Sequence, residues 1–146
     1  MNKQTDGIDP KIYARALAEN DADLPLPIHI VETDIDLYYR IAVSMYRTVQ
    51  TNNAAGRDSV FIVPVGPTFQ YRRLAWLCTR MPLDLSRMHL FFMDEYLAAD
   101  GSWIDKSSSL SFRGFVEKEV VESMPPASRL DPLQIHFPNP ADPAAY

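Results

Sequence analysis

The chain has 146 residues, of which 47% are apolar, 23% charged and 11% aromatic, a size and composition that suit one globular domain and exclude a multidomain protein. Its 14 Lys and Arg residues against 19 Asp and Glu residues give a net charge of -5 at pH 7, so no basic surface for nucleic acid or anionic membrane is expected. Its apolar runs are far shorter than the ~20 residues of a membrane-spanning helix, and its polar N-terminus lacks a signal-peptide pattern. The sequence therefore predicts a soluble cytoplasmic protein whose partners are small molecules.

The first part of the chain contains two predicted helices. Residues 1–27 form a polar leader with one short helix from Pro10 to Glu19. Ile28–Val31 is a short strand candidate, and Thr33 then provides the N-cap of a longer helix. Apolar residues recur in this helix at intervals of three and four, which predicts one face packed on a sheet: Tyr38, Ile41, Ala42, Met45 and Val49.

Two predicted strands with a helix between them follow. Val60–Val63 is a continuous apolar run, which is typical of a strand buried on both faces, and Met88–Met93 is a second run of this kind. Between them lies a helix that ends before Pro82. Its predicted packing face contains the single cysteine, which is expected to be a buried, unreactive thiol: Tyr71, Leu74, Ala75, Cys78 and Met81.

The last third of the chain is rich in turns. Leu97–Lys106 is a predicted loop, and Ser107–Ser109 offer an N-cap for a helix that packs through Phe112, Phe115, Val116 and Val120. Leu133–His136 is a further strand candidate. Asp142 and Pro143 have the pattern of a helix start although the chain stops at Tyr146, so a truncated domain is expected.

This alternation of strands and helices predicts an α/β fold with an open, mostly parallel sheet and flanking helices. Ligands bind beyond the carboxyl ends of the strands in such sheets. The segment Pro64–Thr68 occupies that position after the first apolar strand. Its Gly66 permits close approach of the backbone, and N–H groups at a helix start can bind a phosphate, although an ordinary turn remains the alternative.

Two adjacent carboxylates, Asp94 and Glu95, follow the second apolar strand directly. A carboxylate that is partly shielded at a strand exit can act as a general base. The alternative is that one of the two acids caps the loop while the other points to solvent. A phosphate-binding loop beside a general base is the minimum requirement for sugar-phosphate chemistry.

The segments FIVPVGPTFQYRRL, HLFFMDEYL and SSSLSFRGF together resemble the N-terminal half of glucosamine-6-phosphate deaminases, within the wider group of glucosamine-phosphate isomerases and 6-phosphogluconolactonases. The resemblance spans residues 28–146 and implies a Rossmann-like fold, with this chain as the N-terminal portion of a single domain. MDEY is its most specific motif. Tyr96 favours the deaminase or isomerase branch, because the lactonases tend to have an arginine there.

The resemblance implies a role for each matching residue. Asp94 corresponds to the acid-base aspartate that moves a proton between C2 and C1 of the opened amino sugar, so that ammonia leaves and fructose 6-phosphate forms. Glu95 and Tyr96 are expected to support the loop. The loop that surrounds the substrate phosphate corresponds to Val65, Gly66, Pro67 and Thr68. It departs from the common Thr-Gly-Gly-Thr form, since Val65 lacks a hydroxyl and Pro67 lacks an N–H.

The second family signature, an Asp-Gly-His motif with the ring-opening histidine, has no counterpart in the sequence. His29, His89 and His136 are therefore predicted to be structural or surface residues, and the basic residues Arg72, Arg73 and Arg113 to lie on solvated helix faces. The isolated chain should show little catalysis. A 6-phosphogluconolactonase-type hydrolase, another sugar-phosphate isomerase and a non-catalytic sugar-phosphate-binding module remain alternatives.

The residue pattern shows no metal-ligand spacing and no cofactor motif, so neither a metal nor an organic cofactor is predicted. The expected partner is a small-molecule sugar phosphate. A missing neighbouring strand would leave an apolar sheet edge open to another chain, and a homo-oligomer is compatible with the sequence.

Overall fold

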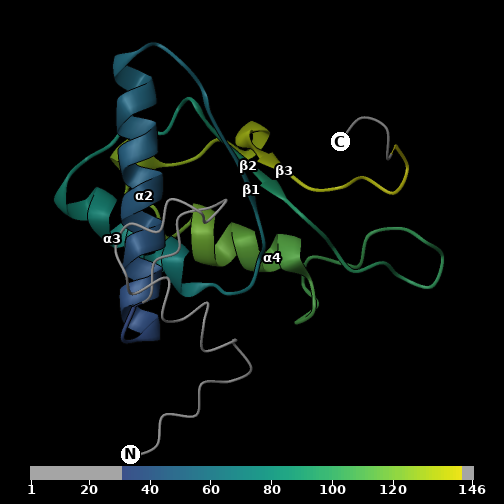
Figure 1. Cartoon of the computed structure of the whole chain (residues 1–146). Helices are drawn as coiled ribbons and strands as arrows, with labels where there is room; N and C mark the ends of the chain where they lie inside the picture. Colours follow the sequence, from purple (N-terminus) through teal and green to yellow (C-terminus); the bar gives the residue numbers. More distant parts are fainter. Residues whose placement is uncertain (1–30, 143–146) are drawn as a thin grey trace, which may run out of the picture. The chain divides into compact units, whose positions relative to one another are not determined.

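The computed structural model describes residues 31–142, which are coloured in Figure 1. The predicted helix at 10–19, the strand candidate at 28–31 except for Val31, and the second residue of the predicted helix start at 142–143 lie outside the described residues. The chain divides into two compact units, Met1–Leu37 and Tyr38–Tyr146, and the second contains the sheet.

The first described helix, α2 (Asp34–Ala54), begins where the sequence predicts. The backbone N–H of Asp36 donates to the Thr33 hydroxyl oxygen at 3.1 Å, and this hydroxyl donates to the Asp36 carboxylate at 2.7 Å. Both contacts stabilise the helix start, where backbone N–H groups lack partners within the helix. The buried residues of α2 lie three or four positions apart, as an amphipathic helix requires: Ala42, Met45, Tyr46 and Val49.

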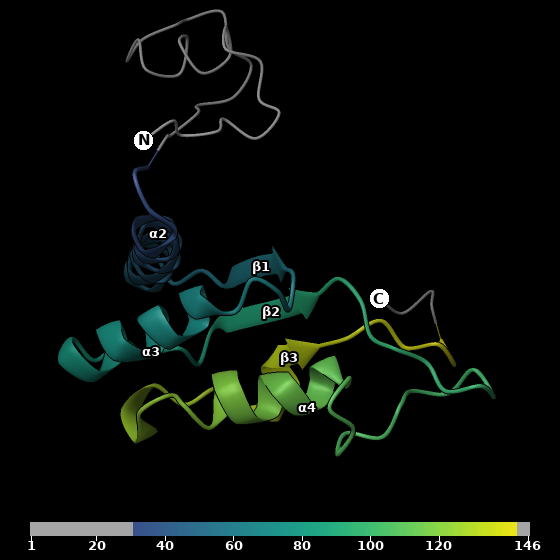
Figure 2. The same cartoon turned by 90° about the horizontal axis from the view of Figure 1, so that it is seen from below.

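The sheet has three parallel strands in the order β1 (Ser59–Val63), β2 (Met88–Phe92) and β3 (Ile135–His136). Val63 pairs with Phe92, and Phe91 pairs with His136. The connection between β1 and β2 contains α3 (Phe69–Arg80), and that between β2 and β3 contains α4 (Phe112–Val116) and the π-helical turn η1 (Glu117–Val121). Figure 2 shows α3 and α4 alongside the strands that they connect. The predicted α/β fold with a parallel sheet is confirmed.

One face of the sheet forms the core. Met88, Leu90 and Phe92 alternate along β2 and are fully buried, as the two-residue period of a strand requires. They belong to one cluster with buried residues of α2, α3, α4 and η1. Cys78 is among these and is 1% exposed, which confirms the predicted buried thiol.

The prediction that β1 is buried on both sides is wrong, because its residues on the opposite face of the sheet are exposed. Val60 is 61% exposed and Ile62 is 77% exposed. Both alternate with Ser59, Phe61 and Val63, which face the core side. Among the described residues β1 is an edge strand of the sheet. The apolar run identifies the strand correctly, but a run of this kind does not state which faces are covered.

Three further boundaries differ from the prediction. Met81 is exposed at the end of α3 rather than buried on its packing face. The serine that caps α4 is Ser111, whose hydroxyl accepts from the Gly114 N–H, because Ser107 instead bonds to Asp105 in a preceding turn. Leu133 is exposed in the short 3-10 helix Pro132–Gln134, so β3 begins at Ile135.

Candidate functional site

The loops predicted to carry function begin side by side. Because β1 and β2 are parallel, their carboxyl ends meet at the same edge of the sheet. The Met93 backbone N–H donates to the Val63 carbonyl at 3.3 Å, just beyond the last strand pair. The segments Pro64–Thr68 and Asp94–Tyr96 therefore leave the sheet from neighbouring positions.

The first loop is anchored by its apolar residue and by a tyrosine. Val65 is buried in the core, while Gly66 and Pro67 are exposed and Thr68 is half-buried. The Thr68 hydroxyl makes no capping bond to α3. The Tyr71 hydroxyl donates to the Pro64 carbonyl, and burial raises the pKa of Tyr71 to about 12, so this phenol remains a neutral donor. A ligand at this loop can reach Gly66 and Thr68, whereas the Val65 side chain is directed into the core.

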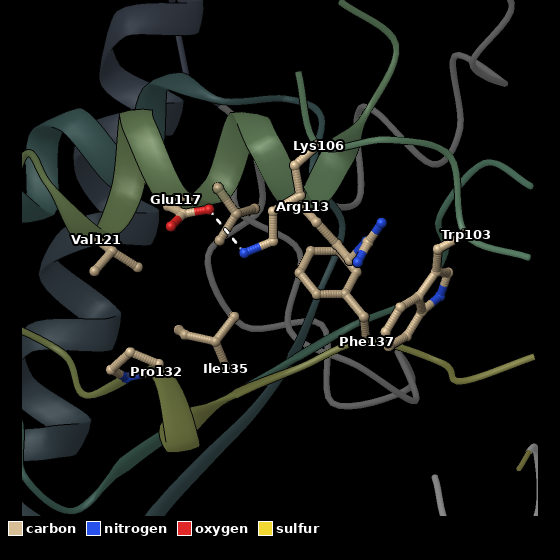
Figure 3. A pocket seen from close by; sticks show the side chains of 9 residues that line it. Trp103, Lys106, Arg113, Glu117, Val121, Pro132, Ile135 and Phe137 are labelled. Atoms are coloured by element: carbon tan, nitrogen blue, oxygen red, sulfur yellow. Dashed lines mark hydrogen bonds and ion pairs between the residues drawn. The ribbon is translucent and has the colours of Figure 1, made fainter. Parts of the chain in front are cut away.

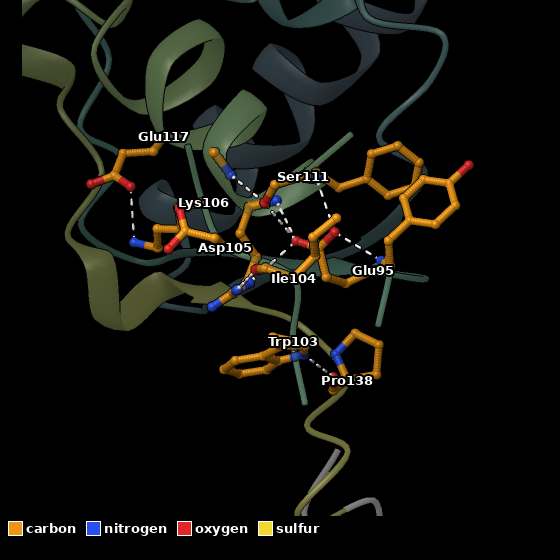
Figure 4. Close-up of polar contacts among 12 residues, drawn as sticks. Glu95, Trp103, Ile104, Asp105, Lys106, Ser111, Glu117 and Pro138 are labelled. Carbon is orange, nitrogen blue, oxygen red and sulfur yellow. Dashed lines mark hydrogen bonds and ion pairs between the residues drawn. The ribbon is translucent and has the colours of Figure 1, made fainter. Parts of the chain in front are cut away.

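The second loop is held by the carboxylate of Glu95, whose side chain is only 1% exposed. It accepts hydrogen bonds from the Ser111 hydroxyl at 3.1 Å and from the backbone N–H groups of Phe112 and Arg113 at 3.0 and 2.8 Å (Figure 4). The Arg113 guanidinium is a further donor, and its Nε lies 3.2 Å away. Glu95 thereby ties the exit of β2 to the first turn of α4, where a negative charge is favoured by the helix dipole.

The protonation of Glu95 follows from these contacts. Burial by itself would raise the pKa of this carboxyl, but the hydrogen bonds from Arg113, Phe112, Tyr96 and Ser111 hold the pKa below its usual value of 4.5. Glu95 is thus a permanently ionised structural group at neutral pH, as the predicted supporting role requires.

Asp94 differs from Glu95 in both burial and bonding. It is exposed and makes no hydrogen bond or ion pair with the described residues. The expected partial shielding at the strand exit applies to Glu95 and not to Asp94. Of the two adjacent acids, one fastens the loop and the other has its carboxylate available to a ligand. The geometry therefore corresponds to the second alternative stated for this pair, in which one acid caps the loop while the other points to solvent.

Tyr96 and the chain that follows it shape the rest of the loop. The Tyr96 ring is half exposed and contacts Phe112 at a centroid distance of 5.1 Å, and its carbonyl accepts the Ile104 N–H at 3.0 Å. Leu97 and Trp103 form an antiparallel bridge across the loop. A Cβ atom added to Gly114 would lie 2.0 Å from the Lys106 carbonyl oxygen, so only glycine permits this approach of the loop to α4.

Sequence reasoning missed Arg113, Ser111 and Gly114. Arg113 is predicted to lie on a solvated face, but its side chain is 16% exposed and its Nη2 also donates to the Ile104 carbonyl at 2.5 Å. Arg72, in contrast, lies on the surface as predicted, in an ion pair with Glu119. We call the bonds from Ser111, Phe112 and Arg113 to the Glu95 carboxylate the Glu95 lock. The only sequence signal for it is an acidic residue after a strand followed by Ser and Arg at the next helix start.

Both described histidines belong to strands: His89 is the second residue of β2, and His136 is the last residue of β3. The His89 Nδ1 and His136 Nε2 atoms are 3.3 Å apart on neighbouring strands, and burial and then the charge of His89 lower the pKa of His136. His29 is outside the described residues. Within residues 31–142 no three His, Cys, Asp or Glu side chains gather in a way that could hold a metal ion. None of the helices in this range is long and apolar enough to span a bilayer.

Comparison with known proteins gives a result for the fold. No family model and no curated protein matches the sequence. Among solved structures, 14 chains match this one. One is a monomeric glucosamine-6-phosphate deaminase, described as a missing link of the NagB superfamily, with a TM-score of 0.61 and 19% sequence identity. The chain shares the fold of this deaminase.

The match covers 75% of the chain and 41% of the deaminase. The chain therefore spans less than half the length of this structural relative. The resemblance noted from the PVGPT and MDEY segments is confirmed at the level of the fold, which is the Rossmann-like α/β architecture that it implied.

Proposed function

We propose that the chain contributes the proton-transfer carboxylate and the phosphate loop of a sugar-phosphate isomerase or deaminase, with glucosamine 6-phosphate as the preferred substrate. The observation that carries this proposal is the environment of Asp94. Its carboxylate is exposed and unpaired among the described residues, at a strand end beside the Pro64–Thr68 loop, and the adjacent Glu95 is locked in place. The fold shared with a glucosamine-6-phosphate deaminase supports it.

In this proposal Asp94 acts on the opened form of the sugar. Its carboxylate takes the proton from C2 and returns it to C1, which shifts the double bond and leaves an imine at C2. Water then adds to C2 and ammonia departs, so amino-sugar phosphate and water give fructose 6-phosphate and ammonia. Because Asp94 is anchored through its neighbour rather than through its own carboxylate, it can accept and release the proton without breaking the loop.

The phosphate is assigned to the first loop. Gly66 and the half-buried Thr68 provide backbone approach and a hydroxyl at the start of α3. Val65 contributes through its backbone alone, because its side chain is buried. Neither described histidine belongs to the two loops, since His89 is the second residue of β2 and the His136 ring stacks on Phe91 at a centroid distance of 4.1 Å. Ring opening is therefore assigned to groups outside the described residues.

The test measures ammonia release from glucosamine 6-phosphate by the natural gene product that contains this chain. Asp94→Asn should reduce kcat by at least about a hundredfold while the substrate still binds. Asp58→Asn is the matched control, since Asp58 precedes the same sheet and pairs with Arg87 at the surface. Normal turnover by Asp94→Asn would contradict the proposal.

Two other outcomes identify the alternatives. Hydrolysis of a phosphosugar lactone without ammonia release would assign the protein to the lactonase type. Calorimetric binding of glucosamine 6-phosphate with no turnover of either compound would identify a binding module.

A further inference from the structure

A cavity of about 260 Å³ lies between the 97–106 loop, α4 with η1, and the segment around β3. Figure 3 shows its walls. No residue of the Pro64–Thr68 loop lines it, and neither does Asp94. Its lining comes from three separate parts of the chain: Trp103, Lys106, Arg113, Val116, Glu117, Val121, Pro132, Ile135 and Phe137.

The cavity is amphipathic. Part of its lining is aliphatic and aromatic, with Val116 fully buried and Ile135 and Phe137 half-buried. Its remaining wall carries the charged groups of Lys106, Arg113 and Glu117. Ligand pockets commonly combine apolar walls with a few polar groups that fix orientation.

The charged groups are arranged so that an anion can be accommodated. Lys106 Nζ lies 2.8 Å from Glu117, but both side chains are more than half exposed, at 55% and 54%. Such a surface ion pair contributes little, and a competing carboxylate can replace it. Arg113 uses Nε and Nη2 for its bonds to Glu95 and Ile104, while Nη1 makes no hydrogen bond to the described residues.

We propose that this cavity binds a small carboxylic acid with an apolar body. The body lies against Val116, Val121 and Phe137, and the carboxylate replaces Glu117 at Lys106 and accepts from Arg113. The test of this binding does not depend on the proposed deaminase or isomerase activity, because neither Asp94 nor any residue of the Pro64–Thr68 loop lines the cavity.

A ligand in the cavity would also affect the functional loop. The Arg113 guanidinium lies 4.3 Å from the centre of the Trp103 ring (Figure 3). The same guanidinium donates to Glu95, the neighbour of Asp94. The Trp103 indole donates to the Pro138 carbonyl at 2.9 Å, which joins the loop to the chain after β3. A ligand that contacts Arg113 and Trp103 therefore contacts the residues that position the loop.

The test uses the fluorescence of Trp103 in a Trp76→Phe background, which removes the second tryptophan from the exposed surface of α3. The probe is 4-phenylbutyrate, and its neutral amide, 4-phenylbutyramide, is the matched ligand without charge. We expect a saturable fluorescence change with 4-phenylbutyrate and an affinity at least about fivefold higher than for the amide, as for one charged contact.

Variants distinguish the contribution of the charged contacts to binding from that of the apolar wall. Lys106→Met should reduce the preference for the acid over the amide, because Arg113 then remains as the single cationic partner of the carboxylate in the cavity wall, and Glu117→Gln should tighten binding of the acid by about two- to fivefold. Lys118→Met is the control for charge, since Lys118 is exposed on the same helical turn and does not line the cavity. Val121→Phe should fill the cavity and abolish binding of both compounds, with the thermal transition confirming that the variant is folded.

Equal affinity for the acid and the amide would overturn the proposal, and so would the absence of a saturable signal with 4-phenylbutyrate up to about 10 mM. Unchanged binding in a folded Val121→Phe variant would also overturn it. A weakening of binding by Lys118→Met equal to that by Lys106→Met would show a general charge effect, which contradicts a specific contact at Lys106.

Discussion

The two loops at the carboxyl edge of the sheet begin at neighbouring strand ends but are secured by different forces. The loop after β1 is anchored by the buried Val65 and by one hydrogen bond from Tyr71. The loop after β2 is anchored by the buried ionic network of Glu95 with Ser111, Phe112 and Arg113. The loop that presents the exposed Asp94 carboxylate is thus held by several bonds, whereas the Pro64–Thr68 loop keeps exposed backbone at Gly66. Mutations should reveal this difference, because the free energy of unfolding should fall most when Glu95 is replaced and least when Tyr71 is replaced.

Loss of the Glu95 carboxylate should have the largest effect. Glu95→Ala removes one partner of a buried ion pair and leaves its donors unsatisfied, so the free energy of unfolding should fall by about 3–5 kcal/mol. Urea denaturation measures this change. Asp94→Asn, at the adjacent exposed acid, should shift the same quantity by less than about 0.5 kcal/mol. Similar losses in both variants would contradict the assignment of Glu95 as the lock.

Gly114→Ala should be the next most disruptive change. The added methyl group would lie 2.0 Å from the Lys106 carbonyl oxygen, so the loop must move away from α4 at a cost of about 1–3 kcal/mol. Gly66→Ala is the control in the other loop, because no atom lies within 4 Å of the added Cβ. Thermal unfolding of the two variants compares them, and equal shifts in Tm would refute the close approach at Gly114.

The Glu95 lock should also be sensitive to acid. Because the folded-state pKa of Glu95 lies below 4.5, the unfolded state takes up the proton first as the pH falls. The stabilisation is therefore complete above the ordinary pKa of 4.5 and is lost as the pH falls through the folded-state pKa. Free energies of unfolding measured from about pH 6 to about pH 3 should fall with decreasing pH in the parent chain. The fall should be smaller in Glu95→Gln, and an equal fall in both would contradict this assignment.

The hydrogen bond from Tyr71 to the loop after β1 should contribute least to the free energy of unfolding. Tyr71→Phe removes the single bond to the Pro64 carbonyl and keeps the ring in the core, so the expected loss is about 1 kcal/mol. Tyr46→Phe is a comparable change elsewhere, since the Tyr46 hydroxyl donates to the Met81 carbonyl at 3.1 Å. Urea denaturation measures both variants. A loss from Tyr71→Phe as large as that from Glu95→Ala would remove the distinction between the two loops.

Local patterns in the sequence determined the order and type of the elements. The helical spacing from Tyr38 to Val49, the cap at Thr33 and the apolar runs at 60–63 and 88–93 correctly predict α2, β1 and β2. The positions of Asp94 and of the Pro64–Thr68 loop at strand ends also follow from the sequence, because a strand exit is a local feature.

Only the tertiary structure decided which of these residues are covered and which are paired. The burial of Glu95 and its bonds to Ser111 and Arg113 depend on residues 16 to 18 positions away in the sequence. The exposure of Ile62 depends on which elements lie over its face of the sheet. Propensity and periodicity are properties of neighbours along the chain, whereas burial and ion pairing are properties of neighbours in space. The sequence therefore identified the two acids, and the packing of α4 against the exit of β2 decided which one is bonded to the first turn of α4 and which one is exposed.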